Sequence, residues 1–341
     1  MPDLDPPPTI PGDAGRRVQR TTGHYIVLAG MIAAWTLLIW SYLVPTVTFQ
    51  RFLKSPETFS IWQGVESFWN AGNPILATIV FVFSMIFPVA KLLALGALWF
   101  KFQRSKKREA AFVWLEFLGK WSMLDVLIIA LFVGAIRMGP VIGGQTISLV
   151  EGRSEVGIEL YGAAIVLSML CTMGLARLEP NRHVPAPTSQ RPLDRLVAVA
   201  FAVMLFLTLT TPVFWVSGEV PYIGTIESEF RLLKTTGKMA SWNQWSMASA
   251  LWIWVIGSPI LRAILGLWVR FRPAGPHVMR LTMGLDEWAM LDVFALGTAM
   301  VQVKLGDLAE CELLSGFWMC LVAGILGILD SILLRTRRDS N

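Results

Sequence analysis

Four ionisable side chains lie within stretches of the sequence that are otherwise apolar: Lys91, Asp125, Arg262 and Asp292. If these stretches are helical, the two cations lie roughly 12–15 Å from the nearest flanking cations, at about 1.5 Å per residue. An ionisable residue in such a setting is costly and is a functional candidate, suited to charge pairing, proton exchange or contact with a polar headgroup. Each aspartate is also expected near the start of a helix, where the helix dipole favours a carboxylate. A purely structural role for the aspartates therefore stays open.

Other kinds of chemistry have no recognisable residues in this sequence. The three cysteines, Cys171, Cys311 and Cys320, form no C-x-x-C pair, and the three histidines are widely separated. This spacing predicts neither a zinc ribbon nor a helical zinc-protease site. Motifs for a phosphate-binding loop and for a serine nucleophile elbow are absent as well. We therefore expect no metal, no cofactor and no enzymatic activity.

The two aspartates belong to a motif that occurs twice. Trp121-Ser-Met-Leu-Asp-Val126 recurs as Trp288-Ala-Met-Leu-Asp-Val293, and each copy continues to a cation followed two residues later by a glycine. Besides the aspartates, the repeated residues are Trp121, Met123, Leu124, Val126, Arg137 and Gly139 in the first copy, and Trp288, Met290, Leu291, Val293, Lys304 and Gly306 in the second. A duplication of this kind indicates two copies of one structural unit.

The apolar stretch before each motif contains a proline three residues ahead of its cation. Pro88 precedes Lys91, and Pro259 precedes Arg262. A proline inside a helix removes one backbone hydrogen bond, which loosens the helix and frees a carbonyl group. Ion pairing would lower the cost of holding both charges inside a bundle, so we predict one inward-facing polar cluster per unit. The predicted pairs are Lys91 with Asp125 and Arg262 with Asp292.

The elements that must position these residues are long apolar helices. Hydrophobic residues make up 54% of the 341 residues and charged residues only 16%, well below the share in soluble domains. The first 23 residues lack the apolar core of a signal peptide. Eight stretches are predicted to cross a membrane: Tyr25–Thr46, Pro74–Phe100, Trp121–Arg137, Leu160–Leu178, Leu196–Val216, Met247–Val269, Trp288–Val303 and Leu313–Leu334. The predicted fold is an all-α polytopic membrane protein.

These eight helices are expected to form two tandem four-helix repeats. Residues 1–23 are predicted to be a cytoplasmic tail, 24–186 the first unit and 187–341 the second. Most of the 29 Lys and Arg residues fall in segments on one side, which predicts cytoplasmic N- and C-termini. The net charge of +5 then reflects topology and contact with lipid, so no nucleic acid is expected as a partner. The composition of the loops Thr48–Asn73 and Ser217–Ser246 favours short extracytoplasmic strands.

The duplicated W-[SA]-M-L-D-V motif, with its Pro-x-x-cation upstream and [RK]-x-G downstream, resembles the signature of the paraquat-inducible protein A family. The resemblance implies a protein of the Gram-negative inner membrane that works with a periplasmic mammalian-cell-entry (MCE) domain protein. It implies movement of phospholipids or similar hydrophobic molecules between membranes, with no enzymatic reaction. Family members commonly carry zinc ribbons built from C-x-x-C pairs, which this chain lacks, so the resemblance implies a ribbon-free member.

Two other functions remain open at this point. In an ion-coupled secondary transporter, Asp125 and Asp292 would titrate and drive alternating access, so Asp→Asn would abolish transport. In a non-transporting scaffold, substitution of Lys91, Asp125, Arg262 or Asp292 would leave partner binding intact.

Overall fold

The structure is a computed structural model, and it describes the greater part of the chain. The described residues are 22–51, 57–70, 72, 74–100, 114–115, 118–136, 141–142, 145–146, 150–178, 192–220, 224–272, 275–306 and 310–335. Below, residues 22–178 are called the N-terminal half and residues 192–335 the C-terminal half.

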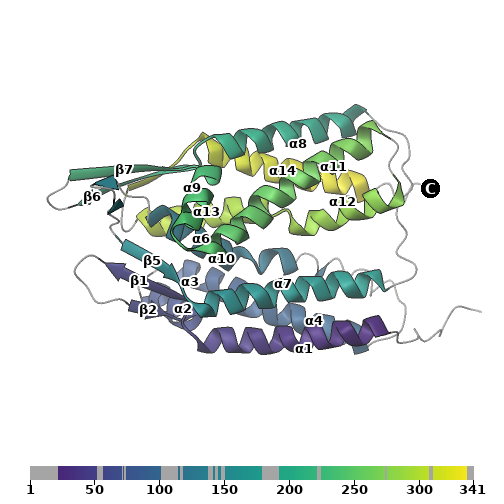
Figure 1. The fold of residues 1–341 in the computed structure, drawn as a ribbon, viewed down its shortest axis with the longest axis horizontal. Coiled ribbons are helices and arrows are strands. Elements are labelled where there is room, and N and C mark those ends of the chain that lie inside the picture. Colours follow the sequence, from purple (N-terminus) through teal and green to yellow (C-terminus); the bar gives the residue numbers. More distant parts are fainter. Residues whose placement is uncertain are drawn as a thin grey trace, which may run out of the picture.

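Long apolar helices run along the length of the molecule (Figure 1). Among the described residues, six helical stretches are long and apolar enough to cross a membrane. Four of them are the α-helices α1 (Thr22–Leu43), α7 (Val156–Arg177), α8 (Pro192–Thr210) and α14 (Ser315–Arg335). α1 and α8 expose large apolar side chains, including Trp40 and Phe206, as expected of helices that face lipid.

The other two long stretches each contain a π-helical segment ahead of a proline. The first joins α3 (Pro74–Phe81), η1 (Val82–Ile86) and α4 (Phe87–Phe100). The second joins α10 (Trp245–Ala250), η2 (Leu251–Gly257) and α11 (Ser258–Phe271). A proline has no amide hydrogen for the preceding turn, so a widened turn before Pro88 and Pro259 has a direct covalent cause.

The third predicted span is a shorter helix than expected, and the helix of the seventh begins and ends three residues later than expected. α6 (Leu124–Ile136) has 13 residues and α13 (Leu291–Gly306) has 16. The tryptophan of each motif ends the preceding helical segment and does not begin the following helix. Trp121 ends a helical turn over residues 118–121, and Trp288 is the last residue of α12 (Pro276–Trp288). The residues after each tryptophan form a non-helical link. Asp125 and Asp292 therefore lie in the first turn of α6 and α13 rather than deeper in a span.

Short strands and helices gather at one end of the bundle (Figure 1). One antiparallel sheet has the order β2 (Glu57–Phe59), β1 (Val47–Arg51), β5 (Val150–Ser154). Another has the order β7 (Gly224–Phe230), β6 (Phe214–Val220), β8 (Glu310–Leu313). A small hairpin pairs β3 (Val141–Ile142) with β4 (Gln145–Thr146). The strands expected in both loops are thus present, together with α2 (Ile61–Asn70) and α9 (Leu232–Ser241), which were not predicted.

The two halves lie side by side, with α6 and α13 near the middle (Figure 1). Gly297 of α13 faces Leu124 and Leu131 of α6, and an added Cβ there would be 3.6 Å from both side chains. The largest hydrophobic cluster combines buried residues of both helices, including Leu127 and Phe294. The centre of the molecule is therefore an apolar contact between the halves.

Candidate functional site

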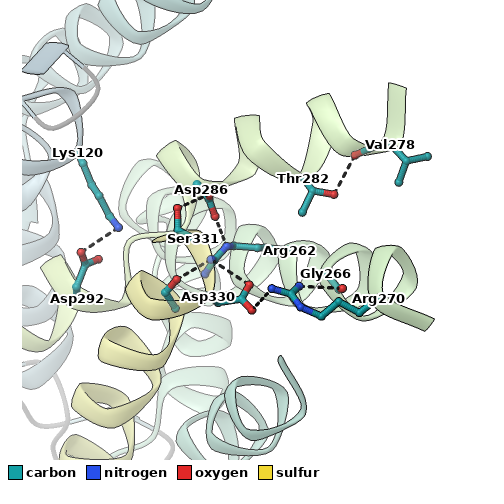
Figure 2. Close-up of polar contacts among 11 residues, drawn as sticks. Lys120, Arg262, Gly266, Arg270, Val278, Thr282, Asp286, Asp292, Asp330 and Ser331 are labelled. Atoms are coloured by element: carbon teal, nitrogen blue, oxygen red, sulfur yellow. Dashed lines mark hydrogen bonds and ion pairs between the residues drawn. The ribbon is translucent and has the colours of Figure 1, made fainter. Parts of the chain in front are cut away.

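Arg262 is the centre of a buried charged cluster in the C-terminal half. It lies on α11 and is only 4% exposed. Its Nε atom forms an ion pair with Oδ1 of Asp286 on α12, and its Nη2 atom lies 3.4 Å from Oδ2 of Asp330 on α14 (Figure 2). The guanidinium carbon also lies 5.0 Å from the centre of the Phe201 ring on α8. One side chain therefore connects four helices.

Arg270, two turns further along α11, closes the other side of this cluster. Its Nη2 atom donates to Oδ1 of Asp330 at 2.5 Å, and its Nη1 atom donates to the Gly266 carbonyl at 3.1 Å. Asp330 thus receives a guanidinium on each carboxylate oxygen (Figure 2). The two arginines and the aspartates Asp286 and Asp330 balance in formal charge, which is the condition under which buried ions are tolerated.

Backbone and hydroxyl groups complete the contacts. Arg262 Nη2 donates to the Gly327 carbonyl at 2.7 Å, and Ser331 Oγ donates to Oδ2 of Asp286 at 2.7 Å. A Cβ added at Gly327 would come within 2.8 Å of Arg262 Nη1, so only glycine gives the guanidinium this approach to α14. The arrangement braces α11 against α12 and α14.

The predicted pair of Arg262 with Asp292 is not the pairing in the structure. Asp292 instead forms an ion pair with Lys120 of the N-terminal half, with 2.9 Å between Nζ and Oδ2. The physical reason is the break in each motif, because Asp292 lies beyond the link that follows Trp288. Asp286, one turn before that link, takes the place beside Arg262.

The Lys120–Asp292 ion pair is one of several polar contacts between the halves. The Nε1 atom of Trp288, the first residue of the second motif, donates a hydrogen bond to the Met173 sulfur at 3.2 Å. Near the strands, Gln244 Oε1 accepts hydrogen bonds from the backbone amide and the hydroxyl of Ser154, at 3.1 and 2.6 Å. The side chains of Lys120 and Asp292 are 19% and 18% exposed, so this pair is more accessible than the arginine cluster.

Lys91 lies three residues after Pro88, as Arg262 lies three residues after Pro259. It is 1% exposed, and its Nζ atom would lie 2.6 Å from a Cβ added at Gly119. The Asp125 side chain lies outside the described residues, so the pair of Lys91 with Asp125 stays a prediction.

The motif tryptophans are held by aromatic stacking on the π-helical segments. Trp121 stacks on Phe83 of η1 at 5.5 Å between ring centres, and Trp288 stacks on Trp254 of η2 at 6.5 Å. Each stacking partner is five residues before a proline. The two copies of the motif are therefore placed against their preceding helices in the same way.

Carbonyl groups ahead of the two prolines accept hydrogen bonds from other segments of the chain. The Ser84 carbonyl accepts the hydroxyls of Tyr42 and Tyr161, at 2.9 and 3.2 Å. The Trp254 carbonyl accepts the Met290 amide of the second motif at 3.1 Å. These contacts fix the motif and its neighbours, and they are separate from the arginine cluster.

The remaining motif residues divide into buried side chains and positions that the structure does not describe. The buried ones are Met123, Leu124, Val126, Met290, Leu291 and Val293. Arg137, Gly139 and the Lys304 side chain lie outside the described residues, and Gly306 is the last residue of α13. Among the described residues, no group of three or more His, Cys, Asp or Glu side chains is arranged to hold a metal ion.

Sequence reasoning missed Lys120, Arg270, Asp286 and Asp330. Asp330 carries the same signal that singled out Lys91 and Arg262, since it lies inside the predicted span Leu313–Leu334. The other three lie near predicted helix ends, where charged residues are common and carry little information.

Comparison with known proteins places the chain in a family. The model of the family described as paraquat-inducible protein A matches residues 26–182 and 193–338. The intermembrane transport protein PqiA of Escherichia coli is 30% identical over 162 residues, which are 46% of this chain and 36% of that protein. A probable intermembrane transport protein of Haemophilus influenzae is 37% identical over 114 residues, 32% of this chain and 26% of that protein. The chain thus spans about a third or less of the length of these curated relatives.

No solved structure matches the chain. The family match extends through both halves and includes both copies of the motif. With its long apolar helices, this chain is a multi-pass membrane protein that belongs to the paraquat-inducible protein A family.

Proposed function

We propose that the chain is the inner-membrane component of an MCE-type lipid transport system. It passes phospholipids or similar hydrophobic molecules between the inner membrane and a periplasmic MCE-domain protein. The observation that carries this proposal is the family match over both halves, supported by relatives that are named intermembrane transport proteins. Direct transfer of lipid requires a membrane-embedded protein with a route for an apolar molecule, and a bundle with lipid-facing apolar helices fits that requirement.

The proposed architecture is two tandem four-helix units, 24–186 and 187–341, after a cytoplasmic tail over 1–23. Equivalent landmarks support it. The Gly157 amide donates to the Pro45 carbonyl at 2.9 Å, and the Gly316 amide donates to the Pro212 carbonyl at 3.0 Å. In each half this contact joins the first helix of the unit to its last. Both termini are proposed to be cytoplasmic, on the basis of the distribution of Lys and Arg.

Within this architecture the two charged sites have different proposed roles. The cluster around Arg262 ties α8, α11, α12 and α14 into one body, because breaking a buried ion pair is costly. The Lys120–Asp292 pair is the more accessible of the two, since its side chains are 19% and 18% exposed. We place the lipid route at the contact between the halves, next to this more accessible pair, with Lys91 and Asp125 beside it.

The experiment is purification of the full chain together with a candidate MCE-domain protein, followed by mass spectrometry of the co-purifying lipid. The proposal predicts a stable complex that carries phospholipid above the level found with an unrelated multi-pass protein prepared in parallel. Absence of both the partner and the lipid enrichment would show that the proposal is wrong.

The second candidate function is an ion-coupled secondary transporter. The observation that favours it is Asp292, whose Oδ1 atom is buried and has no hydrogen-bond partner, while Oδ2 contacts Lys120. An ionisable side chain with an unpartnered buried oxygen in a multi-pass membrane protein is a functional candidate. In that case Asp292→Asn would abolish transport that depends on a proton gradient, whereas a scaffold would tolerate the same substitution.

A further inference from the structure

The wide helical turn η2 contains a carbonyl group with two possible hydrogen-bond donors. The Ser258 amide donates to the Ile253 carbonyl, five residues back, which is the π-helical pattern. In that register the partner of the Trp254 carbonyl would be the amide of Pro259, which has no hydrogen. The Met290 amide of the second motif donates to the Trp254 carbonyl instead, at 3.1 Å.

The same stretch has an alternative α-helical register. The Ser258 amide would then donate to the Trp254 carbonyl, four residues back, and the Met290 amide would lose its acceptor. The two registers differ by one residue, which corresponds to about 100° of rotation and 1.5 Å of rise along a helix. A change of register therefore turns the helix before η2 relative to the helix after it.

The helix before η2 is held by the N-terminal half. α10 packs against α6, and Gln244, directly before α10, accepts two hydrogen bonds from Ser154. The preceding helix α9 touches both α6 and α8. We call Gln244 together with α10 the arm. The arm belongs to the C-terminal half in sequence, but its polar contact with Ser154 and its packing on α6 join it to the N-terminal half.

The helix after η2 is held by the C-terminal half. Arg262 and Arg270 connect α11 to α12 and α14 through buried ion pairs with Asp286 and Asp330. Movement of the halves relative to each other must therefore be taken up in η2, or it must break one of these two sets of contacts. Breaking a buried ion pair is costly. A change of register replaces one helical hydrogen bond by another and releases the Met290 amide, which costs far less.

The equivalent turn of the N-terminal half is connected differently. In η1 the Phe87 amide donates to the Val82 carbonyl, which is the same π-helical bond. The Met123 amide of the first motif, however, donates to the Lys120 carbonyl at 3.4 Å within its own link. A hydrogen bond from the motif to the wide turn is therefore a property of η2, and a proline after the turn does not by itself produce it.

We infer that η2 is a hinge with two registers and that the Met290 amide holds it in the π-helical register. When this amide is released, the Trp254 carbonyl accepts the Ser258 amide, and the arm moves with the N-terminal half relative to α11. The second motif thereby controls the position of one half against the other. The hinge requires neither lipid nor a partner protein, so its test is independent of the proposed function.

The test measures distances between pairs of spin labels by double electron–electron resonance. It uses the full chain in nanodiscs, with Cys171, Cys311 and Cys320 replaced by alanine so that only introduced cysteines are labelled.

The labelled positions are exposed residues on either side of the hinge. Ser249 on α10 and Ile264 on α11 span η2, whereas Ser249 with Val156 of α7 and Leu193 of α8 with Ile264 are reference pairs. Two distances are expected for the pair that spans η2, because both registers are populated. One distance is expected for each reference pair, since its two labels move together.

Two variants shift the hinge in opposite directions. Deletion of Trp252, an exposed residue of η2, removes the additional residue of the wide turn and is expected to leave only the distance of the π-helical register. Met290→Pro removes the amide and is expected to raise the other population about fivefold, the effect of one net hydrogen bond. Ala289 has φ −79° and ψ 106°, which suits a residue before proline. Met290→Ala is the matched control, since it loses the same buried side chain and keeps the amide, and its ratio of distances should match the parent.

Each outcome bears on the hinge. A single distance in the parent that neither the Trp252 deletion nor Met290→Pro alters would overturn the inference. An equal shift in Met290→Ala would also overturn it, because side-chain packing would then set the register. Two distances for the Ser249–Val156 pair would show that the arm does not follow the N-terminal half. Should Met290→Pro fail to fold, the Trp252 deletion decides, since a second distance that persists in it contradicts the hinge.

Discussion

Replacement of Asp330 by asparagine is the sharpest test of the buried cluster. The substitution keeps the shape of the side chain and removes the charge that faces both Arg262 and Arg270. The four-residue cluster then changes from neutral to a formal charge of +1 in a site where the arginines are about 4% exposed. Leaving a buried charge without its partner costs about 3–5 kcal/mol. At roughly 2–4 °C per kcal/mol, the midpoint of thermal unfolding should fall by about 6–20 °C.

The second variant of this test restores neutrality. Arg270→Met alone leaves a charge of −1 and should destabilise by a similar amount, but Arg270→Met/Asp330→Asn again balances Arg262 against Asp286. The double variant should therefore lose no more stability than either single variant. The assay is thermal unfolding of the purified protein in one detergent, followed by intrinsic tryptophan fluorescence at a fixed scan rate. Losses that simply add in the double variant would refute the view that charge balance stabilises this cluster.

The other predictions concern single contacts. Gly327→Ala should lower the unfolding midpoint clearly, since the new Cβ would be 2.8 Å from Arg262 Nη1; an unchanged midpoint would contradict the close approach. Lys120→Asp/Asp292→Lys should recover the stability that either single charge reversal loses, because the swap restores the ion pair; thermal unfolding of the three variants measures this, and a double variant as unstable as the sum of the single ones would contradict it. Burial raises the pKa of the Cys311 thiol to about 11, so maleimide labelling at this position should accelerate about tenfold per pH unit from pH 7 to 10. A plateau near pH 9 would contradict that pKa.

Much of the helical framework could be predicted because the length of each apolar stretch can be read directly from the sequence. Six of the eight predicted stretches correspond to helices long enough to cross a membrane. Both of the other two were predicted to begin too early, since apolar residues continue through the non-helical links after Trp121 and Trp288. In such a link, a contact of the Met290 amide with the Trp254 carbonyl replaces a helical hydrogen bond. Contacts between distant segments of this kind leave no local pattern.

Only some residues of the candidate site could be predicted from the sequence. Depth within an apolar stretch identified Lys91 and Arg262, and both are buried. Partner choice depends on how helices cross, so the spacing of residues could not show that Asp286 and Asp330 reach Arg262 while Asp292 reaches Lys120. Both sequence copies place a buried cation three residues after a proline. In the first copy this cation is Lys91, which lies beside Gly119.

The proposed function is movement of lipid between the inner membrane and a periplasmic MCE-domain partner. The most direct measurement is transfer of a fluorescent phospholipid from proteoliposomes containing the full chain to a purified MCE-domain protein. The account predicts transfer that requires both proteins and that falls when Lys120 and Asp292 are replaced by a cysteine pair and locked by a cross-linker. Transfer at the same rate from protein-free liposomes, or from the locked protein, would contradict it.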